Sequence, residues 1–395
     1  MNPADLFRSP NALARYYSRF RVTERLLLTG HSHQAWPDVG FEAQVEAWRD
    51  AAELVDDKWE RAFAKAARVR EGFARLLGDR ADRIALGQNT HELVVRFLSG
   101  LDLRRRPRLV TTDGEFHTIR RQLDRLPEEG IELVKVPSDP PEEIAERLCR
   151  AVSDATAAVL VSAVLYANAR IVPDLGRVLL ACQRTGTALL VDAYHALNVV
   201  PFPLPELELD GAYVTGGGYK YCQLGEGNCF LRVPPSSTMR PVLTGWFAEF
   251  DALAAPGDGV PYGSGPARFA GATYDPTSHY RAAAAFDFFE REGLAPALLR
   301  QVSQHQVEVL ATTFDSLDAD PAVISRDRRV PVEKIGGFLA LRAPGAEDLV
   351  RRLRREGVHA DHRGDLLRLG PAPYLSDDQL RAAVEALRSV VKMAD

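Results

Sequence analysis

Cysteine is scarce in this chain: only Cys149, Cys182, Cys222 and Cys229 occur among its 395 residues. No two of them form a CxxC pair, and no histidine cluster at metal-ligand spacing accompanies them. The spacing argues against a disulfide framework and against a zinc site. We expect reduced thiols, a cytoplasmic location and no bound metal.

Long apolar runs and an excess of charge of one sign are also lacking. The longest apolar run, residues 157–167, is too short to span a bilayer. Residues 1–20 contain no apolar core followed by a cleavage site, so we expect no secretory signal. The formal net charge is -5, and arginines are interleaved with acids in stretches such as 56–75. This pattern is typical of solvated helix faces and predicts neither a membrane nor a nucleic acid as partner.

Several well-known functional motifs are absent as well. The chain has no glycine-rich dinucleotide fingerprint, no phosphate loop with Gly-Lys-Ser/Thr and no His-Glu-x-x-His sequence. What is present is the composition of an ordinary globular protein, with 46% hydrophobic and 26% charged residues. The length is comfortable for two domains.

Short apolar runs alternate with helical patterns through the middle of the chain. The strand candidates are residues 108–112, 132–136, 157–164, 188–191 and 211–215, and helical patterns cover residues 140–155 and 174–185. Because the apolar runs are near-continuous, both faces of these strands are expected to be covered. The alternation predicts an α/β fold with a largely parallel sheet and helices on both faces.

The segments on either side of this region differ in character. Residues 57–77 place apolar side chains at spacings of three and four, which predicts an amphipathic helix. Residues 234–276 are irregular and rich in Gly and Pro, which is more typical of a functional wall than of a linker. A helical pattern resumes over residues 278–291. A smaller α/β unit then follows, with strands at 337–341 and 366–369 and a last helix at 376–393.

We therefore predict three parts. An N-terminal segment, residues 1–45, contributes to the small domain and to the active-site entrance. The large domain covers residues 46–274, and the small C-terminal domain covers residues 275–395.

A carboxylate and a lysine follow two neighbouring strand candidates. Asp192, in Asp192-Ala-Tyr-His195, ends one buried run, and Lys220 follows the next run after three glycines and Tyr219. Pyridoxal phosphate needs an amine for its aldehyde and an anion beside its pyridine nitrogen, and this pair supplies both. Taken separately, Lys220 could be a surface lysine in a turn, and Asp192 or His195 could cap a helix or a turn.

A second turn has the properties of a phosphate site. Asn89 and Thr90 lie between a short strand, residues 83–86, and a helical pattern, residues 92–100. The first turn of a helix offers unpaired N–H groups to an anion, although ordinary N-capping has the same pattern. Phe116 follows another strand and could stack on a planar ring or pack in the core.

In their order along the chain, these residues resemble kynureninase and its relatives. The matching segments are the phosphate turn, Phe116, Ser162-Ala-Val-Leu-Tyr166, Asp192-Ala-Tyr-His195, Tyr219-Lys220-Tyr, Gly245-Trp-Phe and Arg268-Phe-x-Gly-x-Thr273. Kynureninases belong to the class V aminotransferase group of fold-type I pyridoxal-phosphate enzymes. The resemblance implies a mostly parallel seven-stranded sheet, a smaller C-terminal α/β domain, pyridoxal 5'-phosphate as cofactor, and a homodimer with its active site at the subunit interface.

The resemblance also implies a role for each matched residue. Lys220 forms the Schiff base and removes the α-proton, and Asp192 pairs with the pyridine nitrogen. The other cofactor-binding positions are His195 at the ring, Phe116 stacked on it, Ser162 at its phenolic oxygen, and Asn89, Thr90, Tyr219, Trp246 and Thr273 at the phosphate. Trp246 and Thr273 come from the partner subunit by analogy. Arg368 matches the arginine that binds the substrate carboxylate, and His31 and Ser32 lie in a segment that shapes the substrate pocket.

Three departures from the family concern the substrate. The chain has Gly30-His31-Ser32-His33-Gln34, Ile119 and Trp246-Phe247-Ala248-Glu249 at positions where kynureninases carry other residues. The primary hypothesis is hydrolytic cleavage between the β and γ carbons of kynurenine or a related amino acid. The alternatives are a class V aminotransferase, a β-lyase, and a binding protein of the same fold without turnover.

Overall fold

A seven-stranded sheet forms the centre of the molecule in the computed structural model, which describes residues 1–253 and 259–392. Its strand order is β2-β8-β7-β6-β5-β3-β4. Strands β3 to β7 pair in parallel, and β8 is antiparallel to both β7 and β2. The strands are β2 (Ile84–Gly87), β3 (Arg108–Thr112), β4 (Glu132–Val136), β5 (Thr156–Ser162), β6 (Ala188–Asp192), β7 (Tyr213–Gly217) and β8 (Cys229–Arg232).

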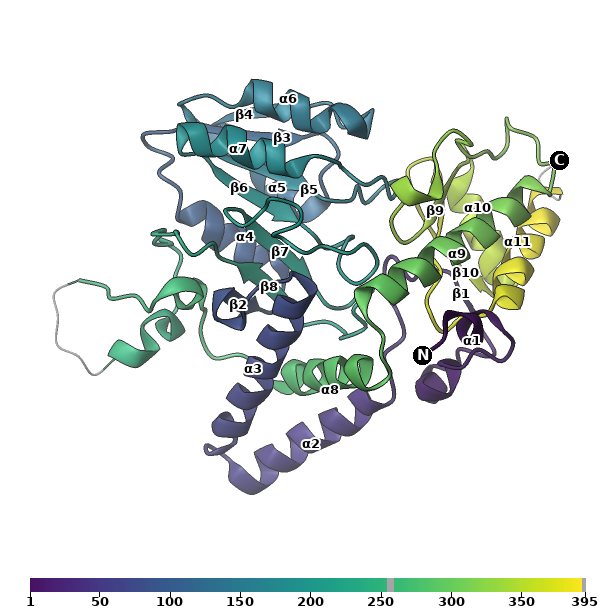
Figure 1. Ribbon diagram of the computed structural model, residues 1–395, viewed down its shortest axis with the longest axis horizontal. Coiled ribbons are helices and arrows are strands. Elements are labelled where there is room, and N and C mark those ends of the chain that lie inside the picture. Colours follow the sequence, from purple (N-terminus) through teal and green to yellow (C-terminus); the bar gives the residue numbers. More distant parts are fainter. Residues whose placement is uncertain (254–258, 393–395) are drawn as a thin grey trace.

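Helices cover both faces of this sheet, as Figure 1 shows. One core contains residues of α3 (Lys58–Leu76), α6 (Ile144–Ala151), α7 (Leu175–Thr185) and α8 (Thr277–Arg291). The other contains residues of α4 (Thr90–Ser99) and α5 (His117–Arg125).

The strands themselves alternate between these two cores. Along β5, Val159 and Val161 belong to the first core, whereas Ala158 and Leu160 belong to the second. Successive side chains of a strand point to opposite faces, so a continuous apolar run supplies both cores at once. The predicted α/β fold with a mostly parallel seven-stranded sheet is confirmed.

A smaller unit forms around a separate hydrophobic core that draws on both ends of the chain (Figure 1). This core includes residues between positions 6 and 35 and between 288 and 390. It lies around the antiparallel sheet β11-β12-β9 and the parallel pair β1-β10. Its elements are α1 (Pro3–Phe7), β1 (Leu26–Leu27), α9 (Pro296–Asp315), β9 (Leu339–Arg342), α10 (Ala346–Arg355), β10 (Val358–His359), β11 (Asp361–Arg363), β12 (Leu366–Leu369) and α11 (Asp377–Lys392).

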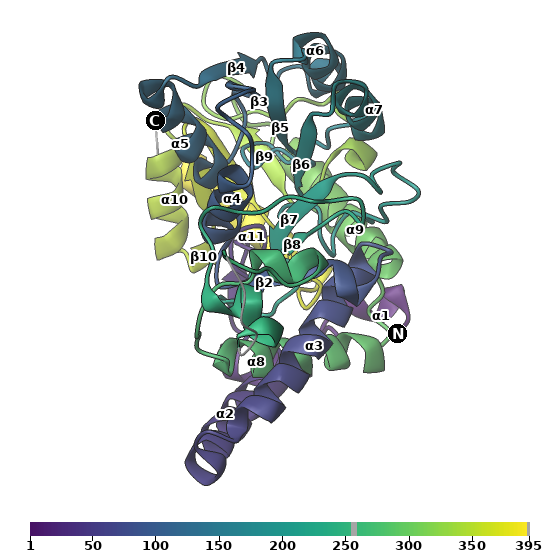
Figure 2. The same cartoon turned by 90° about the vertical axis from the view of Figure 1, so that its left-hand side faces the viewer.

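Helix α2 (Val39–Leu54) packs with α3 and α8, and α2 and the start of α3 extend away from the sheet in Figure 2. Short 3-10 helices complete the fold: η1 (Ala14–Phe20), η2 (Ala81–Arg83), η3 (Leu126–Glu129), η4 (Pro141–Glu143), η5 (Trp246–Ala252), η6 (Gly265–Phe269) and η7 (Val332–Lys334). The domain boundaries given above stay a prediction.

Most predicted elements are present, with shifted ends. Strand β7 runs to Gly217 rather than stopping at residue 215, and α4 begins at Thr90 because Asn89 caps it. Strand β8 and helices α2, α5 and α9 were not predicted. The last residue of the predicted helix 376–393 and residues 254–258 of the irregular segment lie outside the described residues.

Within residues 1–253 and 259–392, no helix combines the length and the apolar character that a bilayer span requires. The same residues contain no group of three or more His, Cys, Asp or Glu side chains arranged to hold a metal ion.

Candidate active site

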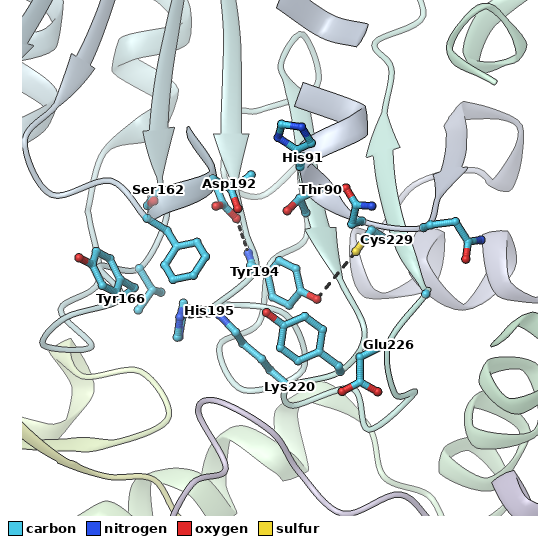
Figure 3. A pocket seen from close by; sticks show the side chains of 17 residues that line it. Thr90, His91, Ser162, Tyr166, Asp192, Tyr194, His195, Lys220, Glu226 and Cys229 are labelled. Carbon is cyan, nitrogen blue, oxygen red and sulfur yellow. Dashed lines mark hydrogen bonds between the residues drawn. The ribbon is translucent and has the colours of Figure 1, made fainter. Parts of the chain in front are cut away.

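A cavity of about 240 Å³ lies at the carboxyl ends of the parallel strands (Figure 3). Ser162 and Asp192 end β5 and β6, and they stand in register with each other and with Thr215, two residues before the end of β7. Ligands bind at this edge in open α/β sheets. Eight of the predicted site residues line the cavity: Asn89, Thr90, Phe116, Ser162, Asp192, His195, Tyr219 and Lys220.

Lys220 is buried among aromatic rings at the centre of this cavity. Its Nζ lies 2.7 Å from His195 Nε2, and it stands 4.5 Å from the ring centre of Tyr194 and 5.2 Å from that of Phe116. Burial lowers the pKa of Lys220 to about 7, with the charge of Asp192 opposing the shift. Burial also lowers the pKa of His195 well below its usual range. A large fraction of Lys220 is therefore an uncharged, nucleophilic amine at neutral pH.

Glycines allow the chain to pass close to this lysine. A Cβ at Gly217 would lie 2.4 Å from the hydroxyl of Tyr194, so only glycine fits at the end of β7. After Lys220, Gly225 has a φ of 70°, in the left-handed region that favours glycine. Arg281 of α8 holds this loop, because its Nε donates to the carbonyl of Leu224 at 2.7 Å.

The lowered pKa of Lys220 predicts how fast the cofactor-free protein reacts with added pyridoxal phosphate. The uncharged amine becomes more abundant as pH rises through about 7, so the rate of covalent attachment should rise between about pH 6 and pH 8 and then level off. Samples quenched with borohydride at timed intervals and analysed by mass measure this rate. A rate that keeps rising towards pH 10, as for an exposed lysine, would contradict the prediction.

Asp192 has one carboxylate oxygen committed to the backbone and one directed to the cavity. Oδ1 accepts a hydrogen bond from the Tyr194 N–H at 2.9 Å, which fixes the carboxylate (Figure 3). No hydrogen bond to Oδ2 occurs within the described part of the chain. Burial raises the pKa of Asp192, while the Tyr194 N–H and the charge of Lys220 lower it. A protonated ring nitrogen beside Oδ2 would supply the partner that this buried acid lacks.

A second buried acid, Glu115, was not predicted. Its carboxylate accepts hydrogen bonds from Ser162 Oγ at 2.6 Å and from Thr112 Oγ1 at 2.7 Å. Burial raises its pKa to about 7, although both hydroxyls oppose the shift. Ser162 thus has its hydroxyl hydrogen directed to Glu115 when that acid is ionised. The position of Glu115 three residues after a buried strand, β3, was the sequence signal that could have identified it.

The turn before α4 has the geometry of an anion site, but the side chain of Asn89 is already used to cap the helix. The Asn89 side chain accepts from the Glu92 N–H at 2.9 Å and donates to the Glu92 carboxylate at 3.0 Å, so it is the N-cap of the helix. Thr90 begins the helix and lines the cavity. The amide groups of this first turn and the helix dipole still favour a phosphate here.

Arg368 is buried, and much of its guanidinium is already paired. Nε and Nη2 donate to Asp361 at 2.8 and 2.6 Å, and Nη1 donates to the carbonyl of Tyr166 at 2.6 Å. His31 Nε2 lies 2.8 Å from the same carboxylate. Burial alone would raise the pKa of Asp361, but hydrogen bonds from His31 and Arg368 hold it well below its usual range. This cluster stands beside the cavity rather than in its lining, and two of the five N–H groups of Arg368 remain available.

Replacing Arg368 with glutamine should lower the free energy of unfolding of the cofactor-free protein by about 3–5 kcal/mol, because it leaves a half-buried Asp361 without its main counter-ion. Arg363 on the same hairpin is the matched control. It is more exposed and stands 3.9 Å from Asp361, so its replacement by glutamine should cost at most about 1 kcal/mol. Urea unfolding of the two variants measures the difference; equal losses would contradict the assignment.

Ser32 and His33 lie nearer to solvent than His31. The Ser32 hydroxyl lies 3.2 Å from His33 Nδ1, and the His33 ring stacks on Tyr219 with 4.9 Å between ring centres. Because Tyr219 lines the cavity, this segment lies at the rim of the site.

Trp246 and Thr273 are not among the residues that line the cavity around Lys220. Trp246 is 43% exposed and packs with Phe247 and Phe250. Thr273 lines a second cavity, which lies against β2 and α4.

This fold and this arrangement define a class of protein. The chain has the fold-type I fold of the pyridoxal-phosphate enzymes related to class V aminotransferases and cysteine desulfurases. No family model matches the sequence. Among known proteins it is similar to the uncharacterized aminotransferase YcbU of Bacillus subtilis (strain 168), at 23% identity over 87% of this chain and 88% of the relative. It is also similar to a probable cysteine desulfurase of Methanothermobacter thermautotrophicus, at 24% identity over 65% of this chain and 63% of that protein.

Solved structures with the same fold include the cystine C-S lyase C-DES in complex with its reaction product, cysteine persulfide. It superimposes with a TM-score of 0.81 over 93% of this chain and 98% of that one, at 17% identity. The cysteine desulfurase of Thermococcus onnurineus NA1 also has a TM-score of 0.81, over 97% and 98% of the two chains, at 18% identity.

The residues of this chain fit pyridoxal phosphate, and these comparisons support it as the cofactor. Lys220 offers a buried amine, Asp192 an unpaired oxygen, and the first turn of α4 a seat for phosphate. His195 has one further unpartnered atom within the described residues, Nδ1. Buried polar atoms are rarely left without a hydrogen-bond partner. One polar ligand bound here would supply partners for several of these atoms at once.

Proposed function

We propose that this protein is a pyridoxal-phosphate enzyme that acts on an amino acid, with Lys220 as the residue that holds the cofactor covalently. The observation that supports this most directly is the buried Lys220 amine, 2.7 Å from His195 and in the same cavity as Asp192. Bound pyridoxal phosphate supplies an aldehyde that captures amino groups and a ring that accepts electrons from the bond being broken.

The side chains of the chain have distinct tasks in this proposal. Lys220 would serve as the base for the substrate α-proton, a task for which a pKa of about 7 is well suited. Asp192 would hold a proton on the ring nitrogen of bound cofactor, and Phe116 would pack against the ring. The free N–H groups of Arg368 bind the α-carboxylate while Asp361 fixes the guanidinium.

The cysteines argue against a desulfurase that passes sulfur to its own thiolate. Cys229 lines the cavity, but burial raises its pKa to about 12, and burial also raises the pKa of Cys182 to about 12. Burial likewise raises the pKa of Cys149 and of Cys222. Thiols of this kind are protonated at neutral pH and react poorly. We therefore favour a β-lyase that eliminates a sulfur substituent and releases it.

Aminotransfer is the second candidate, and the similarity to YcbU along 87% of this chain favours it. The relatives and structures named above support these two interpretations better than the kynureninase-like one. Hydrolysis of kynurenine is therefore not the main proposal. The test described next includes it as one of the possible results.

The test is a product analysis of the cofactor-loaded protein incubated separately with cystine, cysteine and kynurenine, each with and without an added 2-oxo acid. A β-lyase converts cystine and water into cysteine persulfide, pyruvate and ammonia, with pyruvate and ammonia in equal amounts and no need for the oxo acid. Alanine formed from cysteine would instead indicate a desulfurase. Turnover that requires the oxo acid would establish the aminotransferase. Anthranilate and alanine formed from kynurenine would restore the kynureninase hypothesis, and bound cofactor without any turnover would indicate a binding protein.

We further propose a homodimer in which Trp246 and Thr273 act on the partner's site. Several large apolar side chains are exposed and could be covered by such a contact, among them Trp48, Val242, Leu243, Trp246 and Phe250. Light scattering gives the mass in solution, and mixed dimers that combine Lys220→Ala with Thr273→Ala chains test whether residues are shared across the interface.

A further inference from the structure

A second and larger cavity, of about 600 Å³, is lined by β2, by α4, by the segment before α8 and by one residue each of α3 and α8. It meets the cavity around Lys220 at Gln88, which lines both. Its walls carry charged and polar side chains that none of the steps proposed above uses, among them Arg70, Arg96, Glu92, Asp82, Tyr274 and His279.

The charges in this lining do not cancel locally. Asp82 is paired with Arg80 at 2.6 Å, and Glu92 is paired with Arg96 at 3.2 Å. Arg70 makes no hydrogen bond and no ion pair with any residue in the described ranges 1–253 and 259–392. A partly buried guanidinium without a counter-ion is costly, so the lining has one cation left for an anion.

His279 is the second residue of this lining with polar atoms that could bind an anion. The residue is 2% exposed, and within the described part of the chain neither Nδ1 nor Nε2 has a hydrogen-bond partner. Burial, aided by the charge of Arg70, lowers its pKa to about 4, so the ring is neutral and offers one N–H donor. Its ring centre lies 4.9 Å from that of Tyr274, which holds the imidazole in place at the wall.

We infer that this second cavity is a binding site for an oxyanion of the phosphate class, held by the Arg70 guanidinium and the His279 N–H. Arginine matches the geometry of phosphate oxygens, and the second donor, His279, is shielded from bulk water. The anion has two possible sources. It is a free phosphate or phosphorylated molecule, or it is the phosphate group of the cofactor itself, which the shared wall at Gln88 brings near.

Calorimetric titration with inorganic phosphate tests the first source, and it uses the cofactor-loaded protein so that the seat at α4 is filled. We expect saturable binding that weakens at least about tenfold in Arg70→Gln and in His279→Leu. Arg75→Gln, an exposed arginine on the same helix that pairs with Glu290, should leave phosphate binding unchanged.

If the cofactor supplies the anion, the loaded protein will not bind phosphate. Arg70→Gln will then weaken pyridoxal phosphate binding to the cofactor-free protein at least about tenfold and leave the binding of pyridoxal, which has no phosphate, unaltered. Melting temperatures serve as the check on folding, because removal of an uncompensated charge should not destabilise Arg70→Gln. Folded variants with unchanged affinity for both phosphate and pyridoxal phosphate would overturn the inference.

Discussion

Replacing Lys220 with alanine is expected to lower turnover by at least about 10³-fold, because one side chain provides both the covalent link to the cofactor and the base for the α-proton. No other side chain can substitute readily. His195 is the neighbour at 2.7 Å, but burial lowers its pKa well below its usual range, so it is a weak base. The fold should survive, since the change removes an amine that burial disfavours in its charged form.

Mass analysis after borohydride reduction measures the covalent part of this prediction. The unaltered protein should carry the cofactor on the peptide that contains Lys220, and the alanine variant should carry none. Lys135→Ala is the matched control, because Lys135 lies on β4 of the same sheet and pairs with Asp124 away from the cavity. Label on another lysine, or turnover within about tenfold of the unaltered protein, would contradict the assignment.

The parallel part of the fold and the centre of the site could be predicted because both depend on local sequence. The apolar runs that end in Asp192 and in the glycines before Lys220 predict buried parallel strands. Polar residues that follow such strands are expected at the ligand-binding edge of an α/β sheet. Strand β8 was missed because it has only four residues, Cys229–Arg232, and because one of its two pairing partners, β2, lies far away in the sequence.

Features that depend on tertiary contacts could not be predicted. Glu115 is an active-site neighbour because the ends of β3 and β5 place Thr112 and Ser162 around it. The pairing of Arg368 with Asp361 follows from the register of β11 against β12, where these two residues stand opposite each other. A sequence motif identifies such an arginine but does not identify its counter-ion.

Replacing Asp192 with alanine is the second change with a large expected effect, a fall in turnover of about 10²–10³-fold. The reason is electrostatic. Asp192 Oδ1 is fixed by the Tyr194 N–H, and Oδ2 is left to hold a proton on the ring nitrogen. Without this carboxylate the ring nitrogen is no longer held protonated, and the ring accepts electrons less readily. Lys220 also loses a nearby charge that raises its pKa, so its pKa should fall below about 7.

An analogue of the cofactor separates this role from a purely structural one. N-methyl pyridoxal phosphate has a permanent positive charge at the ring nitrogen, and the alanine variant has room for the methyl group. If Asp192 acts by keeping that nitrogen positively charged, the analogue should restore most of the lost turnover in Asp192→Ala and should bind the unaltered protein poorly. Asp210→Asn, which alters an exposed acid outside the cavity, is the control. Its turnover should match that of the unaltered protein with the natural cofactor and with the analogue. Failure of the analogue to restore turnover in a folded, cofactor-loaded variant would show that Asp192 acts by positioning Tyr194 and the end of β6 rather than by its charge.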